Sequence, residues 1–100
     1  MNVIKVNSPF EVGRTDIEEI ADLTTRAHLM LNIRDVIDHN KWSQKQAATV
    51  LRTTQPRISS LKNGEASEFS VGMLITFLVR LGYTSEVTSS KDKIQLELKK

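Results

Sequence analysis

Residues 43–62 read Ser-Gln-Lys-Gln-Ala-Ala-Thr-Val-Leu-Arg-Thr-Thr-Gln-Pro-Arg-Ile-Ser-Ser-Leu-Lys, and they contain two short helical patterns separated by a polar break. The first pattern begins with a capping box, because the Ser43 hydroxyl can accept from the third helical amide while the Gln46 side chain reaches back. The second begins at Thr54, with Pro56 in the first turn, where its missing N–H costs nothing. The stretch predicts two short helices joined by a tight turn.

Both patterns place their apolar residues on one side of each helix. These residues are Ala47, Ala48, Val50, Leu51, Ile58 and Leu61. The second pattern has a polar outer side and ends at Asn63-Gly64, where glycine suits the positive φ that closes many helices. The polar residues are Gln55, Arg57, Ser59, Ser60 and Lys62. A helix whose exposed side enters a DNA groove needs an outer face of this kind.

This arrangement resembles the helix-turn-helix of the xenobiotic-response-element (XRE, lambda-repressor-like) family of transcription factors. The family has a small residue where the two helices cross, here Ala48, and apolar residues at the positions of Ala47, Leu51, Ile58 and Leu61. The resemblance implies an all-α, five-helix lambda-repressor-like domain, with a short C-terminal strand or hairpin added here. The turn departs from the family, since Arg52 stands where glycine is common and would adopt a positive φ at some cost.

The length and composition limit the remaining possibilities. One hundred residues suffice for one domain with a modest core. The absence of cysteine excludes a disulfide framework and a thiolate zinc site. No apolar run reaches the roughly 18–20 residues of a membrane span, and residues 1–9 lack the apolar stretch of a signal peptide. We expect a cytoplasmic protein that does not bind a membrane.

Charge is distributed unevenly along the chain. Residues 41–63 contain five basic residues and no Asp or Glu, whereas residues 14–40 contain three arginines against six acidic residues. The basic residues are Lys41, Lys45, Arg52, Arg57 and Lys62. A basic surface is common on any protein, but one centred on a helix-turn-helix is the electrostatic footprint of phosphate contact.

The flanking segments divide the chain into an arm (residues 1–13), the DNA-binding domain (14–83) and a tail (84–100) that could serve in dimerisation. In the arm, Val3–Val6 is either a short strand or a mobile segment, and it could dock on a partner. The tail alternates apolar and polar residues at Ile94–Leu98, which indicates a strand. Its apolar side must meet a helix of the same chain or the equivalent strand of a second subunit, with a frayed tail as the alternative.

Two further helices are predicted. An apolar stripe runs from Ile17 to Ile37, including Leu23, Ala27, Leu29, Met30, Leu31 and Ile33. It indicates one helix, or a short helix bending at Thr24-Thr25 into a longer one, that ends at Asn40. The stripe belongs to the core, although its first turns could pack against another subunit. Ser70 caps a second, strongly apolar helix over 71–81 that Gly82 closes.

No residue pattern indicates catalysis, a metal or a cofactor. His28 and His39 have no matched ligand spacing, and the four glycines are scattered, so no phosphate-cradling loop exists. Trp42 precedes the Ser43 cap and either packs over Ala47 as a hydrophobic staple or touches the DNA backbone. We therefore expect a binding protein and no enzyme.

The predicted DNA contacts fall into two groups. Base contacts in the major groove are assigned to Gln55, Pro56, Arg57 and Ser60. Gln55 can pair bidentately with adenine, and Pro56 offers only apolar contact. Arg57 can reach a guanine or a phosphate. Phosphate contacts are assigned to Gln44, Lys45, Arg52, Thr54, Ser59, Lys62 and Asn63. The resemblance implies the phosphate role of Gln44 and the backbone contacts of Lys62 and Asn63.

The resemblance narrows further over about residues 8–85. Trp42-Ser43-Gln44, Thr54–Ser59, Phe69-Ser70 and Leu81-Gly82 together are similar to XRE proteins of about this length that include HigA-type antitoxins. This implies a homodimer that represses its own operon and neutralises a small RelE/HigB-like ribonuclease toxin. Two alternatives remain: a stand-alone phage or chromosomal repressor without a toxin, and a protein-interaction module with only the helix-turn-helix shape. The acid-free basic stretch argues against the second alternative.

Overall fold

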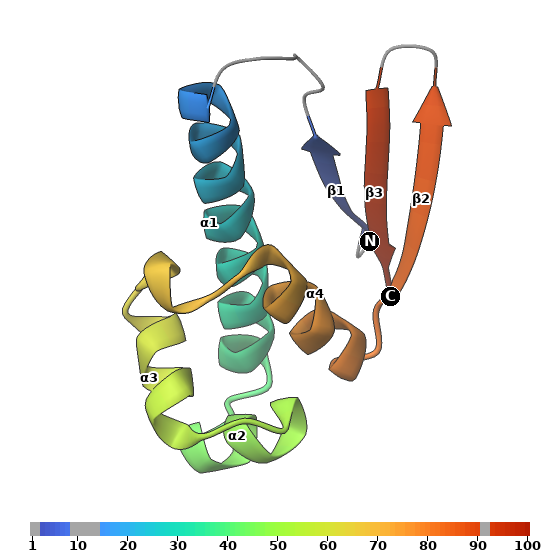
Figure 1. Cartoon of the computed structure of the whole chain (residues 1–100). Helices are drawn as coiled ribbons and strands as arrows, with labels where there is room; N and C mark the ends of the chain where they lie inside the picture. Colours follow the sequence, from blue (N-terminus) through green and yellow to red (C-terminus); the bar gives the residue numbers. More distant parts are fainter. Residues whose placement is uncertain (1–2, 9–14, 91–92) are drawn as a thin grey trace.

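The computed structural model describes residues 3–8, 15–90 and 93–100, with side chains described for residues 22–87, 89 and 95–100. Four α-helices make up most of this part of the chain (Figure 1). They are α1 (Thr15–His39), α2 (Gln44–Leu51), α3 (Gln55–Lys62) and α4 (Val71–Arg80). A 3-10 helix, η1 (Ala66–Glu68), connects α3 to α4. Three strands complete the fold: β1 (Val3–Ser8), β2 (Thr84–Ser90) and β3 (Lys93–Lys99).

The first helix, α1, is the long axis around which α2, α3 and α4 are arranged (Figure 1). It continues without a break through Thr24-Thr25, so the chain has one helix here and not two. The residue with positive φ in the following turn is Lys41 (φ 55°) and not Asn40. Asn40 supports the helix end differently, since its side-chain amide donates to the Val36 carbonyl at 2.8 Å.

The core lies where the C-terminal half of α1 meets the three shorter helices. Of the six apolar residues predicted for the helix-turn-helix, five are buried and Val50 is half-buried against the core; the five are Ala47, Ala48, Leu51, Ile58 and Leu61. From α1 the core takes Leu29, Met30, Ile33 and Ile37, and from α4 it takes Leu74, Phe77 and Leu78. Phe69 and Phe77 pack edge to face with ring centroids 6.3 Å apart. Such burial is the main source of stability for a domain of this size.

The prediction for the α1 stripe was partly wrong. Leu23 is 51% exposed and Leu31 is 50% exposed, and Ala27 between them is also exposed. Residues four apart share one face of a helix, so these three form an outward stripe, whereas Leu29, Met30, Ile33 and Ile37 form the inward one. Spacing alone merged the two stripes, because both repeat at helical intervals.

The strands form one antiparallel sheet in the order β1-β3-β2. β3 is therefore the central strand: Ile4 is opposite Leu98 on one side, and Ser85 is opposite Leu98 on the other. The predicted option of β3 pairing with its equivalent in a second subunit is wrong, because β1 and β2 occupy both of its edges. Leu98 is completely buried, which attaches the sheet to the core.

A cluster of ion pairs connects β2 to β3 on one face of the sheet. Glu86 and Glu97 are directly opposite each other, and like charges in that position repel. The Lys99 ammonium lies 3.4 Å from a carboxylate oxygen of each. Hydrogen bonds to Glu86 and then Glu97 raise the pKa of Lys99 above its usual value. The lysine thereby offsets the repulsion between the two strands.

The fold class differs from the expectation in two respects. The described residues contain four α-helices and one 3-10 helix, so a five-helix domain is not found, and a three-stranded sheet takes the chain out of the all-α class. The C-terminal hairpin was predicted, and the arm assigned to residues 1–13 contributes β1; residues 1–2 and 9–13 of that arm lie outside the described residues. Among the described helices, none has the length and apolarity that crossing a membrane requires.

Candidate nucleic-acid interface

The first helix of the motif, α2, begins with the predicted capping box. The Ser43 hydroxyl accepts from the Gln46 amide at 3.1 Å, and the Ser43 amide donates to the Gln46 side chain at 2.9 Å. The amides of Gln44 and Lys45 have no partner within the helix, as in any first helical turn. Both side chains are exposed. Together these groups form an N-terminal end that can hold a phosphate.

The turn between α2 and α3 depends on Arg52. Its φ of 55° and ψ of 50° are left-handed, so the position does require the conformation that glycine adopts most easily. The following amide, Thr53 N–H, donates to the Ala48 carbonyl at 2.9 Å, which closes the helix end. The Arg52 side chain is exposed beside the motif. The sequence departure at this turn therefore preserves its geometry and adds a cation.

The second helix, α3, begins at the predicted cap. Thr54 has an extended backbone, and its hydroxyl oxygen accepts from the Arg57 amide at 3.3 Å. Pro56 lies in the first turn, where no helical hydrogen bond is lost. Because a threonine hydroxyl both accepts and donates, Thr54 can cap the helix and still donate to a phosphate.

The predicted contact residues of α3 are distributed around its exposed side. At 3.6 residues per turn, Pro56 and Ser60 form a row that faces away from the buried Ile58, and Gln55 and Ser59 form a second row that lies between it and Ile58. Gln55 and Pro56 are exposed, and Ser59 and Ser60 are half-buried. Lys62, half-buried, and Asn63, exposed, end the helix. Gly64 follows with a φ of 73°, as the helix stop requires.

Arg57 differs from the other predicted contacts of α3. Its Nη1 donates to the Glu68 carbonyl at 2.7 Å and lies 3.7 Å from the Met73 sulfur. The guanidinium carbon is 5.7 Å from the centre of the Phe69 ring, within cation–π range. Arg57 precedes the buried Leu61 by one turn, so it lies at the edge of α3 next to η1 and α4.

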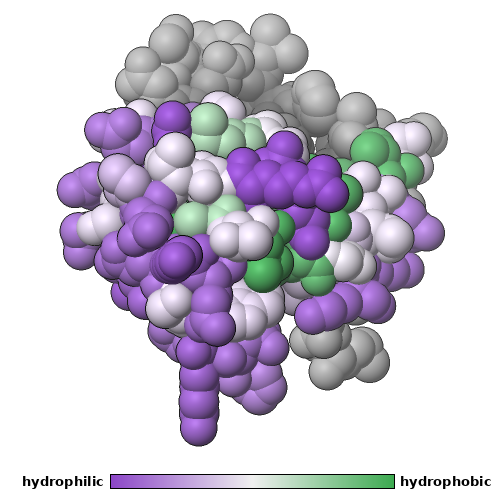
Figure 2. All heavy atoms as spheres, turned by 90° about the horizontal axis from the view of Figure 1, so that it is seen from below, coloured by the Kyte–Doolittle hydropathy of each residue, from purple (hydrophilic) through white to green (hydrophobic). Residues whose placement is uncertain are grey.

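The surface around the motif is polar and basic. Figure 2 views the molecule from the end that carries α2, where hydrophilic residues cover most of the face beside a smaller apolar area. Lys41, Lys45 and Arg52 are exposed, and no described residue forms an ion pair with them or with Lys62. These charges are therefore available to an anionic partner such as the phosphate backbone.

Trp42 is half-buried and packs against the core cluster that contains Ala47. This agrees with the interpretation of Trp42 as a packing residue before the cap. The alternative role, contact with the DNA backbone, requires an indole edge that remains at the surface.

Two arginines that the sequence analysis did not identify as functional residues contact the backbone in and beside the helix-turn-helix. Arg80 of α4 donates to the Leu51 carbonyl at 2.8 Å and lies 3.5 Å from the Arg52 carbonyl. Arg26 of α1 donates to the Ala66 carbonyl at 2.8 Å and to the Phe69 carbonyl at 3.4 Å. Their partners lie far away in sequence, so periodicity and capping patterns give no signal for them.

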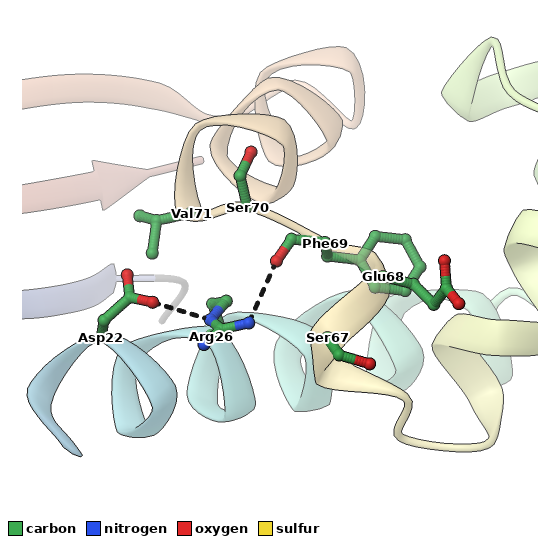
Figure 3. A pocket seen from close by; sticks show the side chains of 7 residues that line it. All are labelled: Asp22, Arg26, Ser67, Glu68, Phe69, Ser70 and Val71. Carbon is green, nitrogen blue, oxygen red and sulfur yellow. Dashed lines mark hydrogen bonds and ion pairs between the residues drawn. The ribbon is translucent and has the colours of Figure 1, made fainter. Parts of the chain in front are cut away.

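Arg26 lines a pocket between α1 and the segment that leads into α4 (Figure 3). Its Nε lies 3.0 Å from Asp22, an ion pair whose angle falls short of hydrogen-bond geometry. In Figure 3, Asp22 points toward Arg26, and Arg26 points toward the Phe69 carbonyl. These contacts connect Arg26 to η1 and to the residue that follows it. Among the residues that the structure describes, there is no cluster of three or more His, Asp or Glu side chains that could hold a metal ion.

A family model described as a helix-turn-helix domain matches residues 14–89, which include all four α-helices and most of β2. None of the curated proteins matches the chain.

Proposed function

The chain belongs to the family of this helix-turn-helix domain, and from that membership we propose that it is a sequence-specific, DNA-binding transcriptional regulator of XRE type. One observation carries the proposal: α3 exposes a polar face between two intact helix caps, in a stretch of chain that is basic and free of acids. A helix that only packed against protein would need neither an exposed polar face nor a basic, acid-free surrounding sequence.

The exposed rows of α3 enter the major groove in this proposal. Gln55, at the start of the helix, pairs with an adenine, and Ser60 donates to or accepts from a base edge one turn later. Pro56 lacks a donor and contributes apolar contact, for example with a thymine methyl group. The fourth predicted base contact, Arg57, is engaged within the protein in the free state.

Phosphate contacts surround this helix. Gln44 and Lys45 bind at the N-terminus of α2, where free amides add to the side chains. Thr54 and Ser59 donate through their hydroxyls. Arg52, Lys62 and Asn63 contact the backbone on either side of the groove. These seven residues fix the orientation of the protein, and the bases facing α3 determine the sequence that it selects.

The finer role proposed for the protein is that of an antitoxin. In this role a homodimer represses its own operon and binds a small RelE/HigB-like ribonuclease toxin. The support is the sequence similarity to HigA-type proteins in the motif stretches quoted above. A two-fold dimer would bind half-sites roughly 34 Å apart, one turn of DNA.

Two experiments test these levels separately. Selection from a pool of random duplexes should enrich one sequence motif, and enrichment of no motif would contradict the DNA-binding proposal. Co-expression with any short neighbouring reading frame that encodes a basic, RelE-like protein should give a complex and restore growth. If no complex forms and growth is not restored, the antitoxin role is wrong, and a stand-alone repressor remains.

A further inference from the structure

We infer that Arg57 is a positioning residue that fixes the angle of α3 against the rest of the domain and reads no base. The inference deepens the proposed DNA-binding function and rests on it. It reassigns the one arginine of α3, whose residue type would otherwise suggest contact with a guanine.

The first argument is the place of Arg57 on its helix. Residues four apart lie on the same side, so Arg57 shares a side with Leu61, which is completely buried. Gln55 and Ser59 form a row nearly opposite. A side chain at the buried edge of α3 cannot follow Gln55 into a groove without leaving the packing surface.

The second argument is that its guanidinium is already engaged within the protein. The hydrogen bond to the Glu68 carbonyl is 2.7 Å long, in the range of charge-assisted bonds. The Phe69 ring lies 5.7 Å from the guanidinium carbon, and the Met73 sulfur is 3.7 Å from Nη1. Turning toward DNA would leave the Glu68 carbonyl without this donor and would break the cation–π contact.

The third argument is that the partner segment is itself held in place. Arg26 reaches the same segment from α1 and donates to the carbonyl of Ala66 and to that of Phe69, the bond drawn in Figure 3. Phe69 is 3% exposed and packs on Phe77 of α4. Arg57 thus connects α3 to a segment that is fixed to both α1 and α4. This chain of contacts sets the tilt of the recognition helix.

Binding measurements distinguish this role from direct contact with DNA. The affinities of wild type, Arg57→Met and Arg57→Lys would be measured on the selected duplex and on its single-base variants. The temperature is one at which circular dichroism shows every protein variant to be folded. Arg57→Met should weaken binding to all duplexes by one common factor, about 3- to 10-fold, if the lost bond is worth what an average intramolecular hydrogen bond usually is. The salt dependence should stay unchanged, and Arg57→Lys should recover only part of the loss.

Two comparison variants calibrate those results. Gln55→Ala should alter preference at one base pair, and Lys62→Ala should reduce the salt slope. If Arg57→Met behaves like Gln55→Ala, the arginine reads a base and the inference is overturned. If it behaves like Lys62→Ala, the arginine binds a phosphate, and the inference is overturned equally. Unchanged affinity would also overturn it, because a purely stabilising residue leaves a folded protein's binding intact.

Nuclear magnetic resonance of the arginine side chains tests the contact directly. In the free protein the Arg57 signals should be shifted by the Phe69 ring, and Phe69→Leu should remove that shift. Adding the duplex should preserve it; loss of the shift with new contacts to DNA protons would overturn the inference. If wild type binds no duplex, the proposed function fails, whereas absence of the ring-induced shift in the free protein is what refutes the Arg57–Phe69 contact.

Discussion

The guanidinium of Arg80 donates a 2.8 Å hydrogen bond to the carbonyl oxygen of Leu51, and it thereby ties the last turn of α2 to α4. The last carbonyls of a helix have no partner within it, and Leu51 is in the core. Arg80 satisfies this acceptor and connects α2 to α4, whereas Arg57 connects α3 to η1.

Replacing Arg80 with methionine should therefore destabilise the protein. The substitution keeps an apolar stem but leaves the Leu51 carbonyl without its charged donor, which should lower the free energy of unfolding by about 1–3 kcal/mol. Urea denaturation followed by circular dichroism measures the loss. Arg34→Met is the matched control, since no hydrogen bond or ion pair of Arg34 occurs in the described part of the chain. Equal effects of the two substitutions would contradict the role of Arg80.

The capping box makes a second prediction about stability. Ser43→Ala removes the acceptor for the Gln46 amide and should lower the free energy of unfolding by about 1 kcal/mol. Ser67→Ala, at an exposed serine of η1, should change it by far less. Thermal and urea unfolding of both variants would check this, and a neutral Ser43→Ala would show that the box contributes little to α2.

Replacing Arg52 with glycine should have opposite effects on the stability of the protein and on its affinity for DNA. Arg52→Gly relieves the left-handed conformation (φ 55°), so we expect the free energy of unfolding to rise by about 0.5–1 kcal/mol, after the entropy cost of glycine. The lost charge should weaken DNA binding and flatten the salt slope by about one unit. Arg52→Ala is the control, because it loses the same charge without relieving the backbone. A glycine variant no more stable than the alanine variant would contradict the strain.

Lys62 should act on all DNA sequences alike. Lys62→Ala removes a phosphate contact, so affinity should fall by a similar factor for selected and unrelated duplexes, with a salt slope smaller by about one unit. Fluorescence anisotropy titrations at several salt concentrations measure both quantities. Lys100→Ala removes a lysine that lies over the Tyr83 ring (5.8 Å), outside the motif, and should leave the slope unchanged. A loss of affinity confined to one sequence would instead make Lys62 a base contact.

The local features of the helix-turn-helix could be predicted because they depend on residues close together in sequence. Ser43, Thr54 and Ser70 each cap the helix expected of them, and the buried positions follow the helical period. The positive φ of Arg52 was likewise foreseeable, since the position is one where glycine is common. Such signals involve three or four neighbouring residues, which a single sequence displays directly.

The features that could not be predicted depend on contacts between distant residues. β1 pairs with β3 across nearly the whole chain, and nothing in Val3–Ser8 identifies its partner. Arg26 and Arg80 bond carbonyls 29 to 43 residues away, and backbone acceptors leave no trace in side-chain patterns. For Arg57 a signal did exist, because its position one turn before Leu61 places it at the buried edge of α3. The prediction from the sequence followed the residue type, which suggested contact with a guanine or a phosphate, and did not use this spacing.

The central claim is that α3 reads DNA sequence through its exposed face, and Gln55 tests it most directly. Duplexes would be selected from one random pool by wild type and by Gln55→Ala in parallel, followed by titration of the best sequence. We predict that wild type enriches one motif, and that the variant loses preference at a single base pair and about 1–3 kcal/mol of binding free energy on that motif. An identical motif with unchanged affinity for the Gln55→Ala protein would contradict the claim.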